Sequence, residues 1–312
     1  MLHVGRLRVL CEVVRRGSFS AAADALDYTQ SAVSQAIARL EAETGATLVV
    51  RDRRRVYPTA AGTTLVEHAE AILAQIETAE ADLAAVLGVR AGRLRVASFP
   101  SAGATLIPLA VATFRKGHPD VSLTLAEGEP EEIAPRLRGG EFDLALLFAF
   151  PGAREQPAAG LHAVKLLDDP MHVALPQDHP LAQNATLQLS DLRNEQWVQT
   201  SAASPCARHV VRVCLGAGFE PHVTFESDDY EAVQGLVAAG VGVALIPGLA
   251  LTRVHPGIVV RSLTPTPSRS VMAATVPGPG VAPAARTMLS ILVHAAEEYG
   301  ETSSAAPKAV SV

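Results

Sequence analysis

The residues with the clearest chemical potential are polar side chains on one face of a helical pattern at residues 29–43. Three apolar residues at helical spacing, which predict its buried face, are Val33, Ile37 and Leu40. At 100° per residue the opposite face carries Ser31, Ser34, Gln35 and Ala38. Small residues let a helix approach base edges, glutamine can form two hydrogen bonds to adenine, and serine can donate or accept. This face therefore fits the major groove of DNA, and the alternative is an ordinary solvated helix face.

A dense group of arginines follows this helix, consisting of Arg51, Arg53, Arg54 and Arg55. The flanking segments, residues 48–51 and 56–57, predict two short strands that form a β-wing around a basic turn. Like charges at this density repel one another unless an anion faces them. Phosphates and a narrow minor groove supply such an anion, so we expect the wing to contact DNA.

The elements that must position these side chains are short helices with recognisable ends. A first helical pattern ends at Gly17, and Ser18 or Ser20 is placed to cap a second short helix. Thr29 is placed to cap the third helix, which carries the polar face, and Gly45 stops it. These signals predict three helices followed by the wing.

One long helical pattern without glycine or proline covers residues 63–86. Its apolar residues repeat at alternating spacings of four and three, and they are Leu65, Ala69, Ile72, Ile76, Ala79, Leu83 and Val86. Such a stripe predicts pairing with a second helix and hence a dimer. The alternative is that the stripe packs onto its own domain.

Composition narrows the remaining possibilities. The chain has 312 residues, 48% of them hydrophobic, and a formal charge of −6, which argues against a polyanion partner until the charge is divided along the chain. Residues 1–60 hold nine arginines against six acidic residues, so this segment alone is basic. No HExxH, GxSxG, P-loop or Cys/His cluster occurs, and we expect no catalytic residue, metal or cofactor. Three cysteines, no secretory signal and no apolar stretch of transmembrane length favour a cytoplasmic protein without a membrane partner.

The N-terminal residues resemble the winged helix-turn-helix of LysR-type transcriptional regulators. The similarity is carried by residues 19–26, 29–37, 40–41 and 48–51, followed by Arg54 to Val56, Thr59 and Gly62. It implies that Gln30, Ser31, Ser34 and Gln35 face the major groove and that Arg53, Arg54 and Arg55 lie at the wing. The full set of expected DNA contacts is Ser20, Thr29, Gln30, Ser31, Ser34, Gln35, Arg39, Arg51, Arg53, Arg54, Arg55 and Thr59. The chain departs from the family pattern at Ser31, Arg53 and Pro58, where Pro, Gly and Leu are usual.

From residue 93 onward, short apolar runs alternate with helical patterns, which predicts an α/β fold with a mainly parallel sheet. More loosely, this region resembles the family's effector domain, which is like a periplasmic binding protein with two α/β lobes. The expected organisation is a DNA-binding domain at 1–62, a linker and dimerisation helix at 63–90, an effector domain at 91–300 and a tail at 301–312. Lobe I is expected at about 91–168 and 268–300, and lobe II at about 169–267.

A small-molecule effector is expected between these lobes, where strand ends and helix N-termini meet. The resemblance points to Ser101 and Phe148 from one lobe and to Thr200 and Ser201 from the other. Each hydroxyl could equally be a simple helix cap. Phe148 stands where some family members that respond to aromatic acids have an arginine, which argues against a dicarboxylate as the effector.

Cys206 and Cys214 raise a redox hypothesis, because some members of the family sense oxidants through two cysteines in this lobe. If residues 206–216 are helical, the two lie about 12 Å apart along the axis. A disulfide needs Cα atoms within about 7 Å, so it would require local unfolding. An oxidant switch is therefore the less favoured hypothesis.

The sequence thus predicts a transcriptional regulator that binds double-stranded DNA at an interrupted palindrome as a homodimer, which assembles further to a tetramer, and whose activity a small molecule modulates. RNA polymerase is an expected partner if the protein activates transcription. The alternative is a solute-binding or enzymatic α/β protein with a basic N-terminal appendage.

Overall fold

The computed structural model describes residues 2–52, 55–86, 92–153, 156–278 and 281–304, with the side chains of 51–52, 77–78, 80–86 and 302–304 outside the description. Two compact units are present. The first contains Met1–Arg95, Asp120–Leu123 and Pro135–Asp143, and the second contains Val96–Pro119, Thr124–Ala134 and Leu144–Val312. Arg53 and Arg54, the centre of the expected wing, lie outside the described residues.

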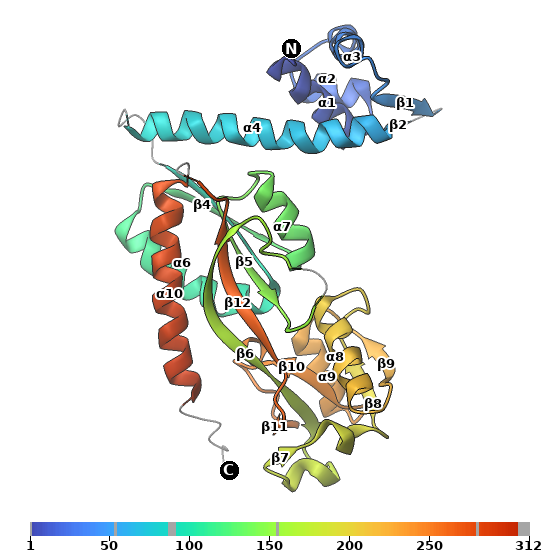
Figure 1. Ribbon diagram of the computed structural model, residues 1–312, viewed down its shortest axis with the longest axis vertical. Coiled ribbons are helices and arrows are strands. Elements are labelled where there is room, and N and C mark those ends of the chain that lie inside the picture. The colour runs from blue at the N-terminus through green and yellow to red at the C-terminus, as the bar shows by residue number, and fades with distance from the viewer. Residues whose placement is uncertain (1, 53–54, 87–91, 154–155, 279–280, 305–312) are drawn as a thin grey trace. The chain divides into compact units, whose positions relative to one another are not determined.

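The first unit begins with three helices, a two-stranded hairpin and a long helix (Figure 1). These elements are α1 (Val4–Arg16), α2 (Phe19–Ala25), α3 (Gln30–Thr44), β1 (Val49–Asp52), β2 (Arg55–Pro58) and α4 (Ala60–Val86). The predicted ends are confirmed at Gly17 and Gly45, which are left-handed C-caps with φ of 61° and 68°. Ser18, rather than Ser20, caps α2 by accepting a hydrogen bond from the backbone N–H of Ala21.

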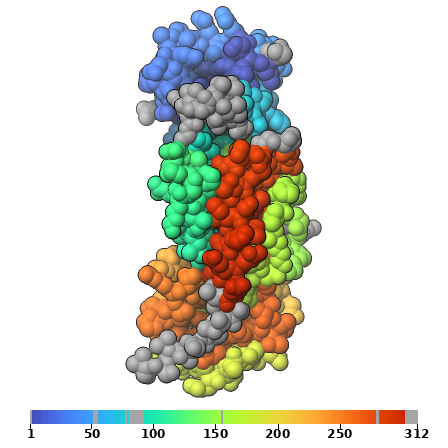
Figure 2. All heavy atoms as spheres, turned by 90° about the vertical axis from the view of Figure 1, so that its left-hand side faces the viewer, coloured from blue at the N-terminus to red at the C-terminus, as the bar shows by residue number. Residues whose placement is uncertain are grey.

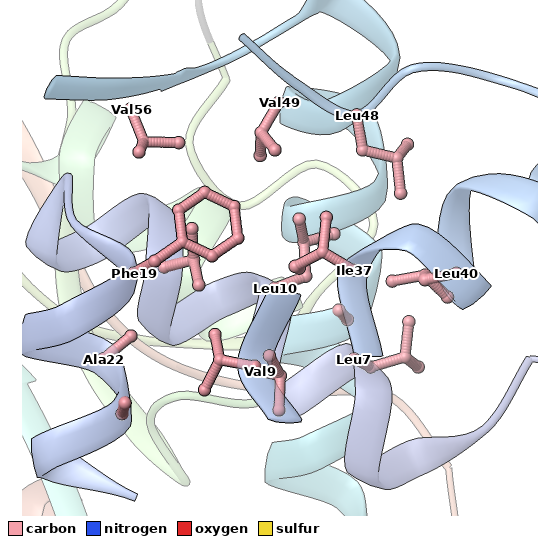
Figure 3. Close-up of a cluster of buried hydrophobic side chains, with 14 residues drawn as sticks. Leu7, Val9, Leu10, Phe19, Ala22, Ile37, Leu40, Leu48, Val49 and Val56 are labelled. Atoms are coloured by element: carbon pink, nitrogen blue, oxygen red, sulfur yellow. The ribbon is translucent and has the colours of Figure 1, made fainter. Parts of the chain in front are cut away.

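A single apolar core holds these helices and the hairpin together. Val33, Ile37 and Leu40 of α3 are all buried in it, which confirms the predicted stripe. Figure 3 shows Ile37 and Leu40 near Leu10 of α1 and near Leu48, at the start of the hairpin. Because one face of α3 is fixed in this core, its opposite face is turned outward.

Helix α4 starts three residues earlier than the sequence pattern predicts, because Thr59 forms its beginning. The Thr59 hydroxyl donates to the carbonyl oxygen of Thr47 at 2.7 Å and accepts from the backbone N–H of Gly62 at 3.0 Å. At Gly62 the helix approaches β1 so closely that an added Cβ would overlap the carbonyl oxygen of Leu48. Glycine at this position therefore sets how tightly the long helix joins the hairpin.

The predicted α4 stripe divides into two parts. Leu65 and Ala69 pack against the core of the first unit, and Ala69 is fully buried there. This part of the stripe follows the alternative prediction, in which the stripe packs onto its own domain. Farther along, Ile72 is 40% exposed, Ile76 is half-buried and Ala79 is exposed. The side chains of Leu83 and Val86 lie outside the description. The pairing surface available on the described part of α4 therefore begins at Ile72.

The second unit is built on a mixed sheet with strand order β4-β3-β5-β12-β6-β11-β7, to which β10 adds by pairing with β6. The strands of this sheet are β3 (Arg93–Ser98), β4 (Ser122–Glu127), β5 (Leu144–Ala149), β6 (His162–Pro176), β7 (Thr186–Leu187), β10 (Ala244–Pro247), β11 (Ile258–Leu263) and β12 (Ser268–Thr275). A separate two-stranded sheet contains β8 (Gln196–Gln199) and β9 (His222–Glu226).

The expectation of a mainly parallel sheet was wrong. β12 runs antiparallel to both β5 and β6, and β10 and β11 run antiparallel to β6, whereas β3 and β5 are parallel. The reason is that β6 is one long strand, and the chain returns from far along the sequence as β12 to pair with it. β6 continues without a break through residues 168–169, where one lobe boundary was predicted, and β12 begins at Ser268, where the other was predicted.

Helices cover this sheet. They are α5 (Pro100–Ala104), α6 (Leu106–Gly117), α7 (Pro130–Arg138), α8 (Pro205–Gly216), α9 (Tyr230–Ala238) and α10 (Pro283–Ser304), with short 3-10 turns at Pro180–Gln183, Leu189–Leu192 and Gly248–Ala250. Figure 2 shows α10 and α6 side by side, which agrees with the contacts between them. At the other end of the sheet, Val233 and Val237 of α9 pack with Val198 and Ile246. Among the described helices, none is long and apolar enough to span a membrane.

Candidate functional site

Helix α3 carries five of the residues predicted to contact DNA. Gln30, Ser31, Gln35 and Arg39 are exposed, and Ser34 is half-buried. Thr29 is the N-cap of α3, where its hydroxyl accepts from the backbone N–H of Ala32 at 3.2 Å. The helix therefore presents two amides, two serines and an arginine on a surface that the rest of the first unit does not cover.

Some arginines of the first unit are paired with acidic residues, and others are not. Glu12 accepts hydrogen bonds from Arg15 and Arg16, and these two arginines hold the pKa of its carboxyl below the usual range. Arg6 pairs with Glu43 at 2.6 Å. In contrast, Arg39 on α3 and Arg55 on β2 have no acidic partner among the described residues. Among the described residues, unpaired positive charge is therefore present both on the helix and on the hairpin that are expected to contact DNA.

Of the remaining predicted DNA contacts, Thr59 has a structural task within the chain. The hydroxyl of Thr59 is used within the chain, because it bonds to the hairpin and to the start of α4. Ser20 is exposed on α2 and does not cap that helix. Arg51 lies on β1, and its side chain falls outside the description along with Arg53 and Arg54.

Glu41 fixes the hairpin to α3, a role that the sequence did not reveal. Its Oε1 accepts from the backbone N–H of Leu48 at 2.8 Å and from that of Val49 at 3.4 Å. The two donors lie at the entry to β1, seven and eight residues beyond Glu41. A carboxylate at the C-terminal end of a helix is unfavourable to the helix dipole, so its presence there is a signal of such a specific acceptor role.

In the second unit, the predicted effector residues do not surround one open space. Ser101 is buried, and its hydroxyl accepts from Nη2 of Arg269 at 2.6 Å. The hydroxyls of Thr200 and Ser204 lie 2.5 Å apart, and Ser204 caps α8. The backbone N–H of Ser201 donates to Asp228 at 2.8 Å. The hydroxyls of Ser101 and Thr200 are thus bonded within the chain, and only Phe148 of the predicted set lines the pocket described below.

Arg269 occupies the centre of this region, although no local sequence pattern indicates its role. The residue is 1% exposed, and its guanidinium lies over the rings of Phe99 and Phe148, at 4.9 and 4.4 Å from their centroids. Nε donates to Asp169 at 2.9 Å, and the charge of Asp169 supports the raised pKa of Arg269 against the effect of burial. A buried arginine that is paired and covered by two rings is a fixed element of the fold.

A pocket of about 320 Å³ lies beside this centre. Its lining residues come from the start of α7, the end of β5 with the following loop, and α8, and they are Pro130, Glu131, Phe148, Ala149, Phe150, Gly152, Ala153, Pro157, Pro205, Arg208, His209 and Arg212. The volume is at the small end of the range of about 300–1,000 Å³ that is typical of metabolite sites. This pocket is therefore a candidate ligand site in the second unit, and Ser101, Thr200 and Ser201 do not line it.

The two cysteines of the redox hypothesis both lie on α8, which confirms the helix expected at 206–216. Cys206 and Cys214 are buried. Burial raises the pKa of both thiols, to about 12 for Cys214, although the charge of Arg269 opposes the shift at Cys206. Both groups are therefore protonated at neutral pH, the unreactive form of a thiol.

Comparisons with known proteins agree with this arrangement. Residues 4–63 match the family "Bacterial regulatory helix-turn-helix protein, lysR family", and residues 87–297 match the "LysR substrate binding domain". The probable HTH-type transcriptional regulator LrrA of Synechococcus elongatus is 32% identical over 303 residues, which cover 96% of this chain and all of LrrA.

Solved structures show the same fold. A full-length OxyR variant from Pseudomonas aeruginosa aligns with a TM-score of 0.70 at 22% identity and covers 95% of both chains. Full-length CbnR in complex with its target DNA aligns with a TM-score of 0.67 at 21% identity, covering 94% of this chain and 100% of CbnR. The family models together span nearly the whole sequence, and the chain belongs to the LysR family of bacterial transcriptional regulators.

Proposed function

We propose that this regulator binds double-stranded DNA with the outward face of α3 in the major groove and the β1–β2 hairpin against the backbone. The observation that carries the proposal is the polar α3 face, with Gln35 and Arg39 exposed and Arg39 without an acidic partner among the described residues. The CbnR structure, solved with its target DNA, supports this use of the fold. Family membership argues against the alternative of a solute-binding or enzymatic protein.

A gel-shift with DNA flanking the protein's own gene tests this proposal. Gln35→Ala is expected to cost about 1–3 kcal/mol of discrimination if Gln35 contacts a base. Arg54→Ala is expected to weaken binding to all sequences and to lower the salt dependence by about one counterion. Arg193→Ala, which changes an exposed arginine of the second unit, serves as the control. Absence of specific retardation, or equal retardation by all three variants, would contradict the proposal.

We infer further that two chains pair through α4 and read the halves of an interrupted palindrome. The support is the part of the apolar stripe that is not buried in the first unit, where Ile72 and Ala79 are exposed and Ile76 is half-buried. Ile72→Glu should shift the sedimentation profile toward monomer, whereas Glu67→Gln on the same helix should not. Assembly of dimers into a tetramer, contact with RNA polymerase if the protein activates, and a cytoplasmic location belong to the same proposal. An unchanged profile for Ile72→Glu would rule out this pairing surface.

Control by a small molecule is the last part of the proposal. The match of residues 87–297 to the LysR substrate binding domain and the pocket beside α8 support it. A ligand that binds the native state raises the melting temperature by mass action, so a thermal-shift screen of metabolites is the direct test. A ligand found in this way should also change the retardation of DNA, and one that binds without doing so is not the effector.

A further inference from the structure

We propose that the pocket beside α8 binds a small planar molecule that carries one carboxylate, and that Arg212 is the residue that receives this group. The inference rests on the proposed function, since such a molecule would be the effector. None of the predicted hydroxyl residues Ser101, Thr200 and Ser201 lines this pocket. The hydroxyls of Ser101 and Thr200 are already bonded within the chain.

The walls of the pocket favour a flat apolar body. His209 stacks on Phe150 with ring centroids 3.8 Å apart and an angle of 8° between the planes. Phe148 meets Phe150 edge-on at 5.7 Å, which fixes the position of the stacked pair. Pro130, Pro157 and Pro205 add rigid apolar surface to the lining. Aromatic and proline walls at this volume suit a single ring better than a long flexible chain.

The charges of the lining leave an excess of one positive charge. Arg208 pairs with Glu131 across the pocket, from α8 to the start of α7. Arg212 has no acidic partner among the described residues, and its Nη2 lies 2.7 Å from Nδ1 of His209. Burial and the charge of Arg212 lower the pKa of His209 to about 4, so this ring is neutral near pH 7. One uncompensated guanidinium selects a monoanion, and a carboxylate matches its planar fork.

The hydrogen bonds of His209 add an independent indication. A neutral imidazole that accepts from Arg212 at Nδ1 carries its hydrogen on Nε2. His209 is only 6% exposed, and its Nε2 is buried without a hydrogen-bond partner among the described residues. A buried donor without an acceptor is costly, so a ligand that supplies an oxygen or a ring nitrogen near His209 gains from satisfying it.

The position of the site also suggests how binding is communicated. The lining joins α8 to α7 and to the end of β5, and the Arg208–Glu131 pair is a polar tie between two of these elements. A bound carboxylate beside Arg212 adds negative charge near this tie and competes with Glu131 for Arg208. Occupancy therefore changes the contact between α7 and α8, which is the structural change an effector must produce.

Calorimetric titration of the full chain tests the proposal with matched pairs of probes. The probes are nicotinate with nicotinamide, and indole-3-carboxylate with its amide, so that the members of each pair share a ring and differ only in having a carboxylate or a neutral carboxamide. The acids are expected to bind at least about tenfold more tightly than the amides. Arg212→Gln should remove this preference, Arg212→Lys should restore part of it, and Phe150→Leu should weaken acids and amides alike. Arg253→Gln, at an exposed arginine outside the pocket, is the control.

The proposal is overturned if no acid binds more tightly than its amide, or if Arg212→Gln leaves the preference intact. Melting temperatures of the unliganded variants show whether a loss of ligand binding comes from misfolding. If Arg212→Gln is misfolded, the preference of Arg212→Lys for acids over amides is the test. Gel-shifts without ligand separate this failure from that of the proposed function. If the wild type and Arg212→Gln retard DNA equally while no acid binds, only the ligand assignment fails.

Discussion

Arg269 and Asp169 face each other across adjacent strands, with Nε of Arg269 2.9 Å from Oδ2 of Asp169 and both side chains 2% exposed. Asp169 also accepts from the backbone N–H of Leu249 at 3.0 Å, so its carboxylate connects β12, β6 and the turn after β10. Asp169 thus lies in the middle of β6, and Arg269 lies at the start of β12.

The first prediction concerns this pair. Asp169→Ala is expected to lower the free energy of unfolding by about 3–5 kcal/mol, because it leaves the Arg269 charge buried without its partner. Adding Arg269→Met should recover part of the loss, which denaturant unfolding of both single variants and the double variant will measure. Asp168→Ala breaks the exposed pair with Lys165 and should cost less than about 1 kcal/mol. Strictly additive losses would contradict the coupling.

The second prediction concerns Gly62. Gly62→Ala should destabilise the first unit and reduce retardation of DNA, since the new methyl group would overlap the carbonyl oxygen of Leu48 and force α4 away from the hairpin. Gly5→Ala, within α1, is the matched control, where a methyl group meets only the His3 ring at ordinary distance. That control is expected to be neutral or stabilising by about 0.5–1 kcal/mol. Equal thermal stability of the two variants would show that the close approach is not required.

The third prediction concerns pH. The pKa of His209 falls from 6.5 to about 4 on folding. As the pH decreases, this histidine is therefore protonated at a higher pH in the unfolded chain than in the folded chain. Stability should therefore decline between pH 6.5 and about 4 and be unaffected by this group above that window. Burial lowers the pKa of His172 as well, which adds in the same direction. His209→Phe should flatten the dependence of melting temperature on pH, and an unchanged slope would count against the assignment.

The fourth prediction concerns the thiols. Cys206 and Cys214 should react slowly with iodoacetamide in the folded chain at pH 7 and rapidly in urea, because burial raises both pKa values. Cys206→Ser is expected to retard DNA like the wild type before and after treatment with hydrogen peroxide. Fast labelling of Cys206, or a peroxide response lost in that variant, would instead support the redox hypothesis.

Local features of this chain could be predicted from the sequence, because they depend on neighbouring residues. Gly17, Thr29 and Gly45 mark helix ends through backbone conformation and capping, and the stripe of α3 follows from helical periodicity alone. The resemblance to known regulators then supplied the fold and the function, which the comparisons confirm.

Contacts between distant residues could not be read in the same way. Asp169 and Arg269 are 100 positions apart, and nothing in either local pattern indicates the other. The antiparallel return of β12 onto β6 depends on the same long-range pairing, so the sheet was wrongly expected to be mainly parallel. The pocket residues likewise come together only when β5, α7 and α8 are in place.

The bond from Glu41 to the start of β1 has a consequence for the choice of DNA site. One carboxylate near the end of α3 accepts hydrogen bonds from the backbone of both Leu48 and Val49. The helix and the hairpin are therefore joined as a single unit. In the proposed complex with DNA, this unit would span a fixed distance from the bases in the groove to the neighbouring backbone. An operator that inserted one base pair between these two contacts would therefore be rejected by its geometry, even if every base edge were correct.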